Sequence, residues 1–192
     1  EGVPINAQHN NCSGKHLFML AACYSQYGTP VDYLDPLHPL QQSILKLLSA
    51  FGTIDTTVID GCGAPCFVSE LKVLAQVWGS LRDIDSPAMT RIRKAMLGQP
   101  WFYSGTNRLD YQLVSEGRGL LTKVGAAGLI AGILLDQGIS FAIKIRDGSD
   151  AARQLATHEV LRKLGYLRPL NETLLRHNVS GAPVGHWEAH WR

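Results

Sequence analysis

Apolar residues in the first half of the chain recur at the spacing of an α-helix. In residues 13–28 they stand at positions 17, 20, 21 and 24, and Gly28 ends the pattern, which predicts a helix that stops at this glycine. A later segment carries Pro39 in its first turns and Gly52 at its end, as a helix would. Ser69 has the position of an N-cap residue in a third segment. The predicted helices cover residues 13–28, 35–52, about 69–80 and 86–98.

The pattern changes to strands in the second half. Residues 119–148 hold apolar runs separated by glycines, and residues 136–138 (Asp-Gln-Gly) have the composition of a hairpin loop. The predicted strands are 56–60, which is β-branched, 127–134 and 139–146, and a last helix capped by Ser149 or Asp150 follows them. Helices that precede a meander of strands predict an α+β fold, an antiparallel sheet with packed helices.

Composition and charge narrow the class of protein. The 192 residues are 45% hydrophobic, which is enough for a sizeable core. The formal net charge is only +2 and the basic residues are scattered, so the chain has no basic stripe for a nucleic-acid backbone. The longest apolar stretch, residues 128–135, is far shorter than the roughly 20 residues that cross a bilayer. Four irregularly spaced cysteines suggest no disulfide framework, so we expect reduced thiols and a cytoplasmic protein that binds neither nucleic acid nor membrane.

The octapeptide HNNCSGKH, residues 9–16, gathers reactive groups at the start of the first predicted helix. Cys12 precedes Lys15 by three residues and His16 by four, so the three side chains share one face near the positive end of the helix. A thiol in that position is acidified, and its thiolate is both a nucleophile and a metal ligand. The alternative is an ordinary helix start, in which Cys12 is a small buried residue, Ser13 a cap and Lys15 a solvated charge.

A second motif, DGCGAP at residues 60–65, directly follows the short predicted strand. The glycines on either side of Cys62 allow a sharp turn, and Asp60 stands at a strand end, where functional side chains are often displayed. Together with Cys12 and a nearby amine or imidazole, Cys62 would complete a sulfur and nitrogen site for zinc. The alternative is a plain turn in which Asp60 bonds the backbone two residues on.

Lys123 lies inside LLTKVGAAG, an apolar segment that is also predicted to be a strand. A lysine there is expected to be poorly solvated, and a desolvated lysine loses basicity and can act as a general base. The alternative is a lysine on an edge strand that points outward into solvent.

Two pairs match the S-x-x-K pattern of penicillin-binding enzymes, Ser43 with Lys46 and Ser69 with Lys72. Ser43 falls in the middle of a predicted helix, and Ser69 has the position of a cap. We therefore interpret both matches as coincidental.

The motifs HNNCSGKH, DGCGAP and LLTKVGAAG, followed by DGSDAARQLA, resemble in their order the bacterial L-asparaginases of the Rhizobium etli type. This resemblance covers residues 9 to about 165. It implies a fold similar to serine β-lactamases and glutaminases, and hydrolysis of L-asparagine to L-aspartate and ammonia.

The resemblance also implies roles for individual residues. The implied zinc ligands are Cys12, Lys15 and Cys62, the residues that line the substrate site are Asp60, His16 and Asn10, and the lysine that partners a catalytic serine is Lys123. Of these, Lys123, Asp60 and His16 are expected to act in catalysis. Two departures, Ala127 where the family often has Glu and Phe18 where a small residue is usual, predict a different pocket shape.

The family's nucleophilic serines belong to a segment before the first motif, and this chain begins eight residues ahead of that motif. We therefore expect a single domain, the C-terminal portion of a longer asparaginase, with residues 166–192 as a C-terminal appendage. We also expect either a homo-oligomer or an association with the missing N-terminal segment.

Two other functions stay open at this point. One is a metal-binding or interaction domain without catalysis. The other is a thiol hydrolase in which Cys12 is the nucleophile and His16 its base, and this arrangement predicts a low pKa for the Cys12 thiol.

Overall fold

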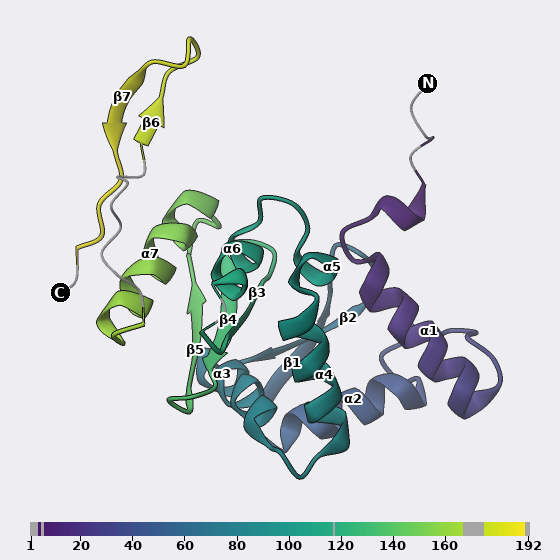
Figure 1. Cartoon of the computed structure of the whole chain (residues 1–192). Coiled ribbons are helices and arrows are strands. Elements are labelled where there is room, and N and C mark those ends of the chain that lie inside the picture. The colour runs from purple at the N-terminus through teal and green to yellow at the C-terminus, as the bar shows by residue number, and fades with distance from the viewer. Residues whose placement is uncertain (1–3, 5, 117, 167–174, 191–192) are drawn as a thin grey trace. The chain divides into compact units, whose positions relative to one another are not determined.

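The structure of the chain is a computed structural model that describes residues 4, 6–116, 118–166 and 175–190. The chain divides into two compact units, Glu1–Val73 and Leu74–Arg192. Helices and antiparallel strands occur in both units, which confirms the predicted α+β class (Figure 1). The described helices are η1 Ala7–His9, α1 Ser13–Tyr27, α2 Pro39–Ser49, α3 Leu71–Gly79, η2 Ser80–Arg82, α4 Pro87–Gly98, α5 Pro100–Ser104, α6 Leu109–Ser115 and α7 Asp150–Lys163. The described strands are β1 Ile54–Ile59, β2 Pro65–Ser69, β3 Leu120–Val124, β4 Leu129–Leu134, β5 Ile139–Lys144, β6 Leu175–His177 and β7 Pro183–His186.

The first unit is built on α1 and α2. α1 ends as predicted, because Gly28 adopts the left-handed conformation at φ 73° and donates its N–H to the Tyr24 carbonyl. α2 contains Pro39 as its first residue, but it ends at Ser49 and not at Gly52. The two helices share a small core whose buried members are Met19, Cys23, Leu40 and Ala64.

A hairpin of β1 and β2 completes the first unit. β1 was predicted and β2 was not: Ser69, expected to cap a helix, is the last residue of β2 and pairs with Ile54. Two backbone hydrogen bonds close the turn, from Asp60 N–H to the Ala64 carbonyl at 2.8 Å and from Gly63 N–H to the Asp60 carbonyl at 2.9 Å. Gly63 adopts φ 85°, a conformation that favours glycine. The DGCGAP motif therefore forms the tight turn of a β-hairpin.

Three antiparallel strands in the order β3–β4–β5 form the sheet of the second unit. The loop predicted at residues 136–138 joins β4 to β5, which confirms the predicted hairpin. β4 is the central strand; its residues 130–134 are all buried, and Gly132 lies opposite both Thr122 and Phe141. Helices pack on both faces of the sheet. The sequence of β4 is therefore apolar throughout and does not alternate between apolar and polar residues.

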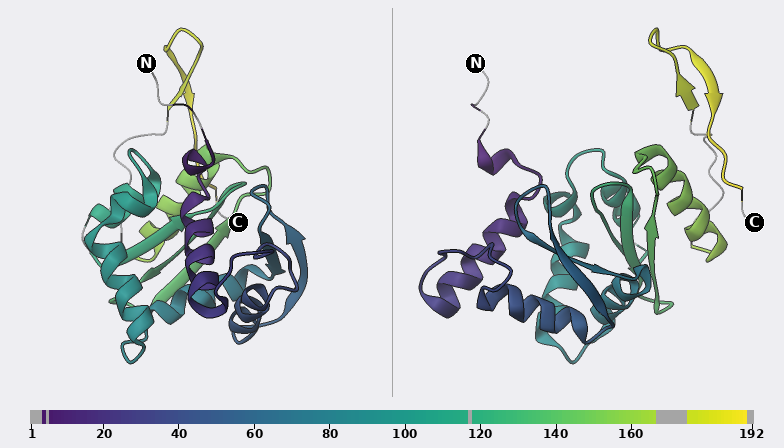
Figure 2. Two further views of the ribbon diagram at one scale, coloured as in Figure 1. Left: turned by 90° about the vertical axis from the view of Figure 1, so that its right-hand side faces the viewer. Right: turned by 180° about the vertical axis from the view of Figure 1, so that it is seen from behind.

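Successive residues of β3 point to opposite faces of this sheet. On one face, Leu120 and Val124 belong to a core shared with α6 and α7. On the other face, Leu121 packs in a core with Leu81 of η2 and with residues of α4. Figure 2 shows the sheet from two further directions, with α7 beside β5 and α6 beside β3. Lys123 falls on the same side of β3 as Leu121.

The predicted appendage, residues 166–192, lies partly outside the described residues. Its first residue, Tyr166, is buried and packs in the core around α7. The described part that follows contains the hairpin of β6 and β7. None of the helices in the described parts of the chain is long and apolar enough to cross a membrane.

Candidate functional site

The first motif surrounds the N-terminus of α1. Cys12 is the N-cap residue, and its backbone N–H donates to Oδ1 of Asn10 at 2.8 Å. The Cys12 carbonyl accepts the first helical hydrogen bond, from the His16 N–H at 3.1 Å. Ser13, which the alternative interpretation made the cap, is the first residue of the helix. Cys12 and Lys15 thus belong to the same first turn of α1, so their side chains are neighbours.

The second motif places its functional side chains on the hairpin turn. Asp60 directly follows β1, and its Oδ1 accepts the Gly61 N–H at 2.7 Å. The thiol of Cys62 donates to Oδ2 of the same carboxylate at 3.4 Å. The turn therefore presents a thiol and a carboxylate side by side.

The two motifs meet at the carboxylate of Asp60. Lys15, 45 residues away along the chain, places its Nζ 3.0 Å from Oδ2 of Asp60. The sulfurs of Cys12 and Cys62 and one oxygen of Asp60 all lie within 4.8 Å of one another. The structure thus brings together the three residues predicted as metal ligands, Cys12, Lys15 and Cys62, and adds Asp60 to them.

Charges in this cluster depend on one another. The hydrogen bond from Lys15, with that from the Gly61 N–H, lowers the pKa of Asp60. Burial disfavours the charge on Lys15, but its hydrogen bonds with Asp60 and Cys62 outweigh that penalty and raise the pKa of the Lys15 amine. Without a metal ion, the two residues form an ion pair in which Lys15 is protonated.

The surroundings of the Cys12 thiol shift its pKa in the direction opposite to the one expected for a thiol hydrolase. Burial, and then the neighbouring Cys62 thiol, raise the pKa of Cys12 above its ordinary value, and the positive charge of Lys15 only partly compensates. His16 is not paired with this thiol: its Nδ1 lies 2.8 Å from the hydroxyl of Tyr33, and the two rings meet edge to face. The protein in this form therefore lacks the Cys12–His16 pair that the alternative predicted.

The other predicted substrate residue, Asn10, is exposed at the end of η1. Its side-chain oxygen is occupied by the Cys12 N–H, as described above. Asn10 thus supports the backbone of the first motif, and its side-chain amide N–H₂ is the part with free hydrogen-bonding capacity.

The donor set of the cluster fits a borderline-soft divalent ion. Ligand atoms around a tetrahedral zinc lie roughly 3.3–3.8 Å apart, which follows from metal–ligand distances of about 2.0–2.3 Å. Cys62 Sγ and Asp60 Oδ2 lie 3.4 Å apart, within that range, and the Cys12 sulfur lies within 4.8 Å of both residues' ligand atoms. Two thiolates with a carboxylate form a set typical of zinc and not of calcium or magnesium. The resemblance implied that Asp60 lines the substrate site, whereas the geometry also makes it a candidate ligand.

Lys123 belongs to a different group, in the second unit. Its Nζ donates to Oδ2 of Asp110 at 3.2 Å and to the Val124 carbonyl at 3.0 Å. The Lys123 side chain is 41% exposed and the Asp110 side chain is fully buried. The prediction of a poorly solvated Lys123 is therefore wrong, because the strand lies at the sheet edge and a carboxylate pairs with the amine. Sequence reasoning missed Asp110, whose only signal is an acidic residue followed by the apolar positions of α6.

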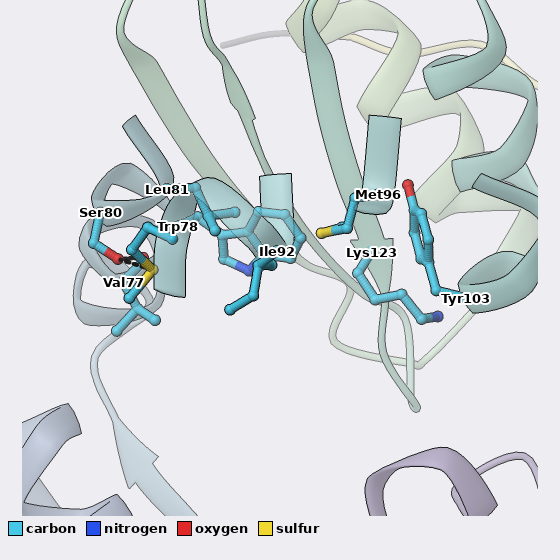
Figure 3. A pocket seen from close by; sticks show the side chains of 9 residues that line it. Val77, Trp78, Ser80, Leu81, Ile92, Met96, Tyr103 and Lys123 are labelled. Atoms are coloured by element: carbon cyan, nitrogen blue, oxygen red, sulfur yellow. Dashed lines mark hydrogen bonds between the residues drawn. The ribbon is translucent and has the colours of Figure 1, made fainter. Parts of the chain in front are cut away.

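Lys123 also lines a pocket of the second unit (Figure 3). The cavity has a volume of about 400 Å³, and its lining residues are Val77, Trp78, Ser80, Leu81, Met89, Ile92, Met96, Tyr103 and Lys123. In Figure 3, Lys123 lies next to Tyr103 at one end, and Val77 and Trp78 lie toward the other. Burial, with a smaller contribution from the charge of Asp110, raises the pKa of Tyr103 to about 12. The lining is thus mostly apolar, with Lys123 and Tyr103 as polar side chains at one end and Ser80 at the other (Figure 3).

Comparison with known proteins yields one family. The family model described as L-asparaginase II matches residues 2–189, which include both motifs of the first unit and Lys123. No curated protein matches the chain.

Proposed function

Because the chain belongs to the L-asparaginase II family, we propose that it hydrolyses the side-chain amide of L-asparagine to give L-aspartate and ammonia. The observation that carries the proposal is a cluster of reactive side chains that come from two motifs far apart in the sequence. Its members are Cys12, Lys15, Asp60 and Cys62. Cys62 also packs against the small core of the first unit, but packing there does not require a lysine and a carboxylate beside the thiols.

Zinc is the proposed metal, held by Cys12, Lys15 and Cys62. When bound, such an ion positions the substrate and polarises a carbonyl oxygen. For Lys15 to serve as a ligand, its amine must lose a proton and leave Asp60, because only the neutral nitrogen has a lone pair to donate. The released Asp60 carboxylate then has the charge to hold the α-ammonium group of asparagine, with His16 and Asn10 as further polar contacts.

The ligand set can be tested by comparing two variants. We expect Lys15→Met to weaken zinc binding at least tenfold, and Asp60→Asn to leave it within about threefold, because the proposed ligands are the amine and the two thiolates. Competition with a fluorescent chelator measures both affinities. The opposite ranking would make Asp60 the third ligand and leave Lys15 as its charged partner.

The nucleophile is proposed to be a serine outside these 192 residues. The hydroxyl of Ser43 donates to the Pro39 carbonyl at 2.8 Å within α2, and that of Ser69 faces the Glu70 carbonyl at 3.3 Å, so both S-x-x-K serines serve local backbone contacts. In the proposed reaction the serine oxygen bonds to the amide carbon, the C–N bond breaks, and the serine proton passes to the nitrogen, which leaves as ammonia. Water then cleaves the aspartyl ester, which gives L-aspartate and restores the serine hydroxyl. Lys123 would partner that serine.

The test is ammonia release from L-asparagine in zinc-containing buffer. We expect little release by the 192 residues alone, restoration when a segment that supplies the proposed serine is added, and loss of the restored activity in Lys123→Met. Rapid turnover by the 192 residues alone, abolished by Ser13→Ala or Cys12→Ala, would overturn the assignment of the nucleophile. Stoichiometric zinc without turnover in either preparation would favour a metal-binding domain that does not catalyse the reaction.

A further inference from the structure

The carboxylate of Asp110 is buried next to a partly exposed lysine. Asp110 lies in the first turn of α6, and its side chain is 0% exposed, whereas that of Lys123 is 41% exposed. An ionised carboxylate is stable in such a position only when charged or polar partners compensate for the lost water. Within the described residues its partners are the Lys123 amine and one backbone N–H.

That backbone N–H belongs to the residue after the lysine. Oδ2 of Asp110 accepts the Val124 N–H at 3.2 Å and the Lys123 Nζ, also at 3.2 Å. One oxygen therefore contacts both the end of the lysine side chain and the strand from which that side chain starts. α6 packs along β3 through Leu113, so the carboxylate is held by the helix as well.

The amine of Lys123 is left with one hydrogen to donate. An ammonium group has three N–H donors, and two of them are used by Asp110 and by the Val124 carbonyl. The remaining N–H is the one available to solvent or to a ligand at the end of the pocket that Lys123 lines.

We propose that Asp110 is a positioning residue that orients Lys123 as a fixed ammonium donor toward the pocket. This inference rests on the proposed function, in which Lys123 partners the reacting serine. It differs from the general-base role expected from the sequence, because an amine that donates to a buried carboxylate and a carbonyl offers a hydrogen bond and a positive charge. The group it addresses is an oxygen that carries negative charge, such as a carboxylate or a developing oxyanion.

A labelling experiment tests the positioning without any enzyme assay. Pulse acetylation of the intact chain, followed by mass spectrometry of its peptides, gives the reaction rate of each lysine. We expect Lys123 to react about tenfold more slowly than the exposed Lys94, because its amine must first break two hydrogen bonds. In Asp110→Asn, which can still accept the Val124 N–H, the rate at Lys123 should approach that at Lys94. Asp85→Asn, at an exposed aspartate, is the matched control and should change neither rate.

The activity measurement separates a donor from a base. In a preparation that hydrolyses asparagine, Lys123→Arg should retain more than about a tenth of kcat and Lys123→Met should lose nearly all of it, because arginine stays charged and donates. Asp110→Asn should lower kcat about tenfold with little change in KM.

Each outcome decides between these roles. Equal acetylation of Lys123 and Lys94 in the unsubstituted chain would overturn the positioning role, even if Asp110→Asn did not fold. Equal inactivity of Lys123→Arg and Lys123→Met would overturn the donor role. If no preparation hydrolyses asparagine, the proposed function fails, and the acetylation rates still decide whether Asp110 positions Lys123.

Discussion

At the scale of single residues, the carboxylate of Asp60 connects two parts of the first unit. It accepts hydrogen bonds from Lys15, from Cys62 and from the Gly61 backbone. A metal ion bound between the two thiolates would replace some of these partners, so the cluster has to change its hydrogen bonds on binding. Substitutions in this cluster are therefore the most direct test of metal binding.

Removal of one thiol should reduce metal binding, because each thiolate supplies one of the few ligands of the ion. We expect Cys62→Ala to lower zinc content from one ion to well below half an ion per chain after gel filtration. Elemental analysis measures this ratio. Cys66→Ala, which removes an exposed thiol on the neighbouring strand β2, is the matched control. Full occupancy in Cys62→Ala would exclude this residue as a ligand.

Tyr103 should make the second unit sensitive to alkaline pH. Its pKa of about 12 in the folded protein exceeds the ordinary value of about 10, so its contribution to stability is complete below pH 10 and is lost as pH rises through 12. Between pH 9 and 11, the free energy of unfolding should fall by about 1 kcal/mol more in the unsubstituted chain than in Tyr103→Phe.

Urea unfolding at the two pH values measures this difference. Tyr24→Phe, at an exposed tyrosine of α1, serves as the control and should follow the unsubstituted chain. Identical pH dependence in Tyr103→Phe and the unsubstituted chain would contradict the assigned burial of this hydroxyl.

At the scale of elements, β4 depends on a glycine for its place between β3 and β5. A Cβ atom at Gly132 would lie 2.5 Å from the Leu121 carbonyl oxygen and 2.7 Å from a methyl group of Thr122. Atoms at these distances overlap, and one of them is backbone, so the strands would have to separate. The glycine thus permits the close approach of β3, the strand that carries Lys123.

Alanine at this position should destabilise the sheet. We expect Gly132→Ala to lower the free energy of unfolding by about 3 kcal/mol, the upper end of the usual cost of overpacking. Gly98→Ala, at the end of α4 where an added Cβ meets no atom within 4 Å, should instead raise it by about 0.5 kcal/mol. Thermal unfolding followed by circular dichroism compares the two. A Gly132→Ala variant as stable as Gly98→Ala would contradict the packing of this strand.

At the scale of the whole molecule, the two compact units hold different chemical groups. The residues predicted as metal ligands belong to the first unit, and Lys123 with Asp110 belongs to the second. Metal binding should therefore stabilise the two units unequally, because a ligand stabilises the structure that forms its site.

Removal of zinc should increase backbone exchange in one unit more than in the other. After treatment with a chelator, we expect faster hydrogen exchange in residues 13–27 and 54–69, and little change in residues 120–144. Hydrogen exchange read by mass spectrometry resolves these segments. Equal acceleration in both units would mean that the metal stabilises the fold as one cooperative structure.

Local sequence signals were sufficient for much of the secondary structure. The stop of α1 at Gly28 and the hairpin loop at residues 136–138 were predicted, since each depends on a few adjacent residues. The N-cap of α7 was predicted as Ser149 or Asp150, and it is Ser149. The motif order also indicated the family, and the match over residues 2–189 confirms it. The Rhizobium etli type, the likeness to β-lactamases and the zinc ion stay predictions.

Errors arose where contacts between distant segments outweighed the local signal. Ser69 resembles a helix cap, but its pairing with Ile54 makes it the end of a strand. The helix α6 has only seven residues, too few for a clear periodic pattern, so its aspartate Asp110 was not noticed. Lys123 was expected to be desolvated from its apolar neighbours, but the strand's place at the sheet edge leaves it partly exposed.

The same distinction applies to the candidate site. Residue types and spacing within HNNCSGKH and DGCGAP were enough to nominate Cys12, Lys15 and Cys62, because three- and four-residue spacings on a helix and the backbone freedom of glycine are local properties. Two contacts could be found only in the folded structure. Asp60 contacts Lys15, which is 45 residues away along the chain, and Asp110 pairs with Lys123. Pairing energies between such groups depend on distance and burial, and neither quantity exists until the segments have been brought together.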